Sequence, residues 1–233
     1  MHIVCKCIKK ALEKLTIHRQ YSVKLNNLHF LLKEGIHDFP PGAFGSTDEL
    51  RRCAALHQKR ILLLACSEQG GAPDSISFAK TGSFLILQHL AASVPSKLDC
   101  EHFEGHSFNA IEKLIFNYDF RHVIVCGHLG CEVIRHWLQP AREGESDVGN
   151  FRRRFNQGTR KLVDSHYLPN NAEERISLMV CEHVLCQIGN MLTHSSIMAR
   201  VKAKRTFFHG WVTDDESARV LGYCPNESAF ALI

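Results

Sequence analysis

Short apolar segments alternate with segments of helical periodicity from about residue 60 onward. Some segments are almost entirely apolar and too short for stable helices, which predicts buried strands at 61–65, 84–87 and 122–126. In longer segments apolar residues recur three or four positions apart, which predicts helices at 109–118, 131–138 and 172–192. Strands that alternate with helices predict an α/β fold, in which helices flank a mostly parallel central β-sheet.

The N-terminal region has a pattern of its own. Apolar residues recur there at helical spacing, with charged residues between them: Val4, Ile8, Leu12 and Leu15. This pattern predicts an amphipathic helix that packs against another surface, such as a partner subunit. We therefore expect residues 1–45 to form an N-terminal helical arm that contacts the second subunit of a dimer, and residues 46–233 to form the globular domain.

Local signals mark the two ends of the globular domain. Ser46 and Glu49 form a capping-box pattern, which predicts a helix that begins there and runs to about His57. The segments 206–212 and 218–223 are separated by turn-forming residues, which predicts a C-terminal hairpin.

Composition excludes several classes of protein. The net charge of +4 over 233 residues shows no strong excess of basic residues, so we expect no nucleic-acid partner. The longest apolar segments are far shorter than the roughly 20 residues of a membrane-spanning helix, so we expect no membrane span. Ten cysteines are scattered over a chain that begins without a secretory signal. This predicts reduced thiols or metal ligands, and a cytoplasmic location.

Potential metal ligands follow two of the predicted strands. Cys66 ends the first strand, while His128 and Cys131 follow the third. Because ligands bind beyond the carboxyl ends of the strands in open parallel sheets, we expect these side chains to meet. Two thiolates and one imidazole suit zinc, and three protein ligands leave a fourth position for water. The alternative at this point is that the cysteines pack in the core and the histidine bonds to the backbone.

The wider sequence around these residues resembles the β-class carbonic anhydrases. The resemblance is carried by Ala65-Cys66-Ser67, by the segment from His122 to Cys131, and by two flanking stretches, Ser107 to Tyr118 and His209 to Tyr223. It implies a zinc-bearing α/β sheet, assembled as a homodimer or a higher homo-oligomer. It also implies reversible hydration of carbon dioxide to bicarbonate by zinc-bound hydroxide, with Cys66, His128 and Cys131 as the zinc ligands.

The first zinc motif departs from the family pattern, Cys-x-Asp-x-Arg. Glu68 stands where the family has an aspartate that orients the zinc-bound water, and Gly70 stands where an arginine holds that aspartate away from the metal. We therefore expect Glu68 to act as the catalytic water-orienting group or as an occasional fourth zinc ligand. Two alternatives stay open: a catalytically silent, zinc-stabilised binding or regulatory protein, and a hydrolase of carbon disulfide or carbonyl sulfide.

Overall fold

The computed structural model describes residues 29–56, 60–69, 83–102, 111, 113–115, 117–139 and 157–233. The strands in these ranges are β1 (Phe30–Leu31), β2 (Ile61–Cys66), β3 (Phe84–His89), β4 (His122–His128), β5 (Phe207–Asp214), β6 (Arg219–Cys224) and β7 (Ala229–Leu232). The helices are α2 (Thr47–Ala55), the 3-10 turn η2 (Leu90–Ala92), α3 (Lys97–His102), α5 (Glu132–Leu138), α7 (Gln157–His166), α8 (Ala172–Leu192) and α9 (Ser195–Lys202). Residues 111, 113–115 and 117 are also helical, as the pattern of 109–118 predicts.

All the strands named above belong to one mixed sheet. Its order is β1-β7-β6-β5-β4-β2-β3, in which β3, β2, β4 and β5 run parallel and β6, β7 and β1 continue the sheet in antiparallel pairings. The predicted α/β fold and C-terminal hairpin are confirmed. The first strand of that hairpin, β5, also pairs in parallel with β4, so the hairpin extends the central sheet.

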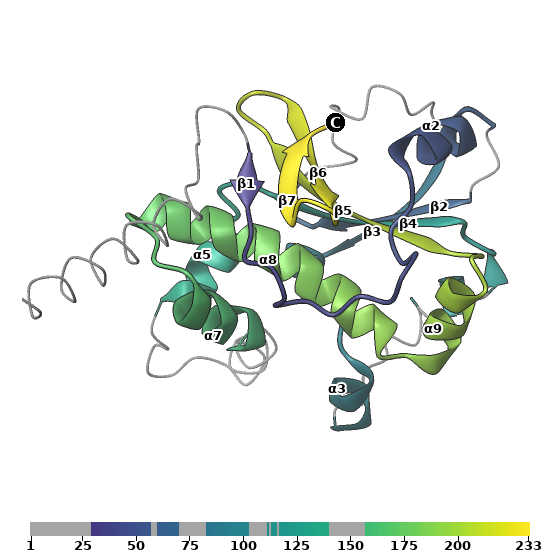
Figure 1. Cartoon of the computed structure of the whole chain (residues 1–233), viewed down its shortest axis with the longest axis horizontal. Coiled ribbons are helices and arrows are strands. Elements are labelled where there is room, and N and C mark those ends of the chain that lie inside the picture. The colour runs from purple at the N-terminus through teal and green to yellow at the C-terminus, as the bar shows by residue number, and fades with distance from the viewer. Residues whose placement is uncertain are drawn as a thin grey trace, which may run out of the picture.

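The central strands are covered on both faces of the sheet: every residue of β2 and of β4 is buried. Side chains of β2 alternate between two apolar clusters: Leu62, Leu64 and Cys66 pack toward α8, whereas Ile61, Leu63 and Ala65 pack with residues of α2. Figure 1 shows α8 along one face of the sheet and α2 on the other. The side chain of Cys66 therefore lies on the α8 side of the sheet.

Capping residues agree with the predicted helix starts. Ser46 is the N-cap of α2, and its Oγ accepts a hydrogen bond from the backbone N of Glu49 at 3.4 Å. The long helix α8 begins and ends where its apolar pattern predicts, and the side chain of Asn171 caps its start. No pattern predicted β1 and β7, because strands of two and four residues are too short to show periodicity.

Residues 29–45, the described part of the predicted arm, pack on the sheet of their own chain. Phe30 pairs with Phe230 of β7, and both Phe30 and Leu32 lie in the core. The predicted helix over Val4 to Leu15 lies outside the described residues. Contact of the arm with a second subunit stays a prediction.

Within the described residues, no single helix combines the length and hydropathy of a membrane span. The helices α8 and α9 pass the test of length and composition together, but they are bent by 96° relative to each other. Most residues of α8 are buried against the sheet and its neighbours, as is usual for the central helix of a globular core.

Candidate metal centre

The parallel pairing of β2 with β4 brings the predicted ligands to one edge of the sheet. Ala65 pairs with Cys126, so Cys66 and His128 both lie at the carboxyl ends of neighbouring strands. Cys131 follows a tight turn in which Gly130 has a φ of 73°, a left-handed conformation that favours glycine. Cys131 is the N-cap residue of α5.

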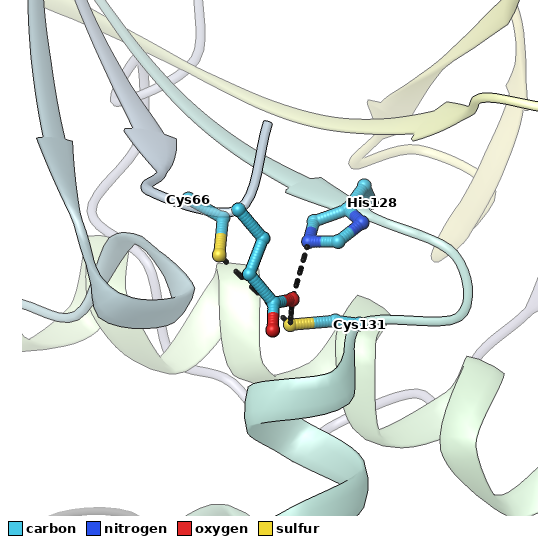
Figure 2. Close-up of side chains that lie close together, drawn as sticks. Cys66, His128 and Cys131 are labelled. Carbon is cyan, nitrogen blue, oxygen red and sulfur yellow. Dashed lines mark hydrogen bonds and ion pairs between the residues drawn. The ribbon is translucent and has the colours of Figure 1, made fainter. Parts of the chain in front are cut away.

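Four potential ligand atoms converge at this edge (Figure 2). The Sγ atoms of Cys66 and Cys131 are 4.0 Å apart, and Oε2 of Glu68 lies 3.3 Å from Cys131 Sγ and 3.3 Å from His128 Nε2. All four atoms lie within 4.8 Å of one another. Cys66, His128 and Cys131 are buried, whereas Glu68 is partly exposed.

The donor set and its spacing fit a tetrahedral zinc ion. Ligand atoms around tetrahedral zinc lie about 3.3 to 3.8 Å apart, given the usual zinc–sulfur and zinc–nitrogen distances. In addition, His128 Nε2 is buried and makes no hydrogen bond to the described residues, although it lies near the Glu68 carboxylate. A buried imidazole nitrogen that makes no hydrogen bond is costly, and one that lies beside two sulfurs is suited to a metal ion.

The ionisation of the cluster favours metal binding. A hydrogen bond from the Cys131 thiol, against the effect of burial and with help from His128, lowers the pKa of the Cys66 thiol to about 4. The same hydrogen bond, together with burial, raises the pKa of Cys131. Burial lowers the pKa of His128, but the nearby Cys66 thiol and the carboxylates of Asp215 and Glu68 outweigh this effect, and the net shift is upward. These interactions favour ionisation of one thiol of the pair, and the thiolate is the form that binds metal.

Groups that the sequence patterns did not single out complete the site. The backbone N of Ala91 donates to Cys66 Sγ at 3.3 Å, and the backbone N of Glu132 donates to Glu68 Oε2 at 3.1 Å. A carboxylate oxygen of Asp215 lies 3.8 Å from Nδ1 of His128. The residue type does not show which backbone N–H groups will donate to a site. The proximity of Asp215 to His128 becomes visible only once β5 is placed beside β4.

Comparison with known proteins identifies the family. A family model described as carbonic anhydrase matches residues 61–220, more than half of the chain, and the match includes the four converging residues. The chain belongs to the β-carbonic anhydrase family. The resemblance noted from the sequence is thereby confirmed, and the altered motif at Glu68 makes the chain a divergent member.

Curated relatives of the chain are carbonic anhydrases of bacteria. The chain is 27% identical to a carbonic anhydrase of Synechocystis over 195 residues, a match that covers 82% of this chain and 70% of the relative. A carbonic anhydrase of Synechococcus elongatus is also 27% identical, over 193 residues, with the same coverage.

Solved structures agree with the fold. The structure of the β-carbonic anhydrase CcaA matches with a TM-score of 0.66 at 25% identity, and the match covers 86% of this chain and 97% of that one. One of two tetrameric β-carbonic anhydrases from Sordaria macrospora matches with a TM-score of 0.57 at 17% identity, over 74% of this chain and 84% of that one.

The structure brings together all four site residues expected from the sequence: Cys66, Glu68, His128 and Cys131. Their binding of an ion stays a prediction. Gly70, which replaces the arginine of the family motif, lies outside the described residues.

Proposed function

We propose that this protein binds zinc through Cys66, His128 and Cys131 and catalyses the reversible hydration of carbon dioxide to bicarbonate. The observation that carries the proposal is the convergence of two thiols and one imidazole at the carboxyl edge of the sheet, within a chain of the carbonic anhydrase family. Zinc, when bound, supplies a Lewis acid that makes water a nucleophile near neutral pH.

We also propose that Glu68 is the fourth ligand in the resting site and that this position limits the rate. Its Oε2 lies 3.3 Å from both Cys131 Sγ and His128 Nε2, at the corner that water would need to occupy. The backbone N of Glu132 donates to the same oxygen and so favours this position. Turnover then requires the carboxylate to move aside, where it can orient the attacking water.

The position of Glu68 also favours a second candidate function. If the carboxylate never leaves, two thiolates, one imidazole and one carboxylate form a closed site of the structural type. The ion would then stabilise the fold without catalysis, and the protein would serve in binding or regulation.

A stopped-flow assay of carbon dioxide hydration separates the two functions. Zinc-loaded protein should show a rate that exceeds that of Cys66→Ser and increases from pH 7 to about 9, because zinc lowers the pKa of water to about 7. A rate equal to that of Cys66→Ser over this range, with zinc still bound by the wild type, would refute catalysis and support the closed structural site.

The variant Gly70→Arg tests the role of Glu68 directly. By resemblance to the family motif, an arginine at position 70 should draw the Glu68 carboxylate away from the ligand corner and raise the hydration rate. Gly71→Arg adds the same side chain one position later and is the matched control. An equal rate in both variants would mean that the position of Glu68 does not limit turnover.

The assembly of the protein is a further part of the proposal. We propose a homodimer or a higher homo-oligomer, in line with the expected role of residues 1–45. Analytical ultracentrifugation of the full chain, compared with a chain that lacks residues 1–28, tests whether the N-terminal part contributes to assembly.

A further inference from the structure

His128 has a second ring nitrogen that faces away from the proposed metal position. Its Nε2 lies within the ligand cluster, whereas Nδ1 lies 3.8 Å from Oδ2 of Asp215. The side chain of His128 is only 9% exposed. An imidazole that binds metal through one nitrogen carries a proton on the other, and a carboxylate that accepts this proton fixes the orientation of the ring.

The register of the sheet places Asp215 beside this nitrogen. The parallel pairing of β4 with β5 sets His128 opposite Thr213, and the backbone N of Leu129 donates to Thr213 O at 2.8 Å. Asp215 comes two residues after Thr213, just beyond the end of β5. The carboxylate therefore reaches His128 from the neighbouring strand, a placement that a shift of register would abolish.

A hydrogen-bond network holds the carboxylate of Asp215. Thr213 Oγ1 donates to Asp215 Oδ1 at 3.2 Å, and Gln69 Nε2 donates to Thr213 Oγ1 at 2.6 Å. With Oδ1 held in this way, Oδ2 is the oxygen nearer to His128. Because Gln69 is adjacent to Glu68, the network links both zinc-motif segments to the end of β5.

The preceding carboxylate has a different role. Asp214 Oδ1 accepts a hydrogen bond from the backbone N of Glu216 at 3.2 Å, and its Oδ2 accepts one from Ser217 Oγ at 2.5 Å. Both oxygens thus bond within the turn that follows β5. Asp214 has the same charge as Asp215 and lies one residue away, which makes it a matched control.

We propose that Asp215 is a positioning residue for His128. Its carboxylate accepts a hydrogen bond from Nδ1–H of His128 and thereby directs the lone pair of Nε2 toward the metal. The distance of 3.8 Å exceeds the usual limit of a direct hydrogen bond by about 0.6 Å, a gap that a small side-chain shift closes. The inference rests on the proposed zinc binding but not on turnover.

Zinc affinity of the full chain, measured by competition with a chelating dye, tests this role. Asp215→Asn should raise the Kd for zinc about 10- to 100-fold, the usual effect of losing such a partner, while Asp214→Asn should change it less than about twofold. Asp215 is 61% exposed at its side chain, so the melting temperature of the metal-free protein should be unchanged in Asp215→Asn. An unchanged Kd in Asp215→Asn would overturn the inference.

The same substitution in a His128→Cys variant tests whether Asp215 orients the imidazole ring or only attracts the zinc cation. In His128→Cys the ligand at position 128 is a thiolate with no second nitrogen, so Asp215→Asn should leave the Kd of this variant unchanged. An equal loss of affinity in both backgrounds would show that the carboxylate acts on the charge of the ion and would overturn the inference. Failure of the wild-type chain to bind zinc would instead refute the proposed function itself, and the inference with it.

Discussion

Replacement of Gly127 by alanine should destabilise the protein by overpacking the contact between β4 and α8. A Cβ atom at position 127 would lie 3.0 Å from Val180 Cγ1 and 3.0 Å from Val184 Cγ2. Carbon atoms pack best at about 3.5 to 4.0 Å, so the neighbours would have to move by about half an ångström or more. Both valines are buried in α8, where β-branched side chains have one strongly preferred rotamer, and they cannot easily turn away.

The expected loss follows from two opposing effects. Overpacking of a dense core destabilises a protein by about 1 to 3 kcal/mol. Replacement of glycine by alanine also lowers the entropy of the unfolded chain, which stabilises the folded state by about 0.4 to 1 kcal/mol. We therefore expect the free energy of unfolding to fall by about 1 to 2 kcal/mol. Gly189→Ala provides the opposite case, because Gly189 lies inside α8 and its added Cβ would meet no atom within 4 Å among the described residues. This change should stabilise the protein by about 0.5 to 1 kcal/mol.

Urea unfolding of the metal-free protein, followed by circular dichroism, measures both variants under the same conditions. Chelation of metal beforehand prevents zinc binding from contributing to the result. The double variant Gly127→Ala, Val184→Ala should lose less stability than the sum of its single changes, because Val184→Ala removes one of the two methyl groups that the alanine at position 127 would crowd. If Gly127→Ala were as stable as the wild type, the rigid contact between β4 and α8 would be refuted.

Further predictions concern two other buried groups. Tyr167→Phe removes a hydroxyl that donates to the buried carboxylate of Glu182 and accepts from the backbone N of Lys33 at 3.0 Å. It should cost about 2 to 3 kcal/mol and lower the Tm by about 4 to 12 °C, whereas Tyr118→Phe, at a residue 57% exposed, should stay within about 0.5 kcal/mol. Burial lowers the pKa of His183 to about 4, so as the pH falls from about 6.5 to 4 the unfolded chain binds this proton first and the free energy of unfolding decreases. Protonation of His183 should account for up to about 3 kcal/mol of that decrease. Urea titrations of the metal-free wild type and of His183→Gln at pH 7, 5.5 and 4.5 should show a smaller decrease in the free energy of unfolding for the variant. An equal decrease in both proteins would contradict the role of His183.

The main elements of the fold could be predicted because their signals are local. Continuous apolar segments such as 61–65 and 122–126 form buried strands, and the apolar pattern of residues 172–192 has the bounds of α8. The candidate ligands Cys66, His128 and Cys131 were recognised for a similar reason. They follow predicted strands, and parallel strands carry the residues at their carboxyl ends to a common edge.

Other features depend on contacts between distant segments. The packing of residues 29–45 on their own sheet depends on pairing between β1 and β7, which are about 200 positions apart in the chain and too short to show a pattern. The approach of Glu68 to Cys131 depends on a side-chain conformation and on a backbone donor at Glu132. Residue type alone specifies neither.

The sequence by itself determined which residues could bind a metal and which class of fold would present them, because ligand chemistry and hydrophobic periodicity are properties of short segments. The tertiary structure decided where the carboxylates lie relative to that cluster. Glu68 lies beside Cys131 and His128 because of its side-chain conformation and the backbone donor at Glu132. Asp215 lies near Nδ1 of His128 because of the register between β4 and β5, which is set by the packing of the whole sheet.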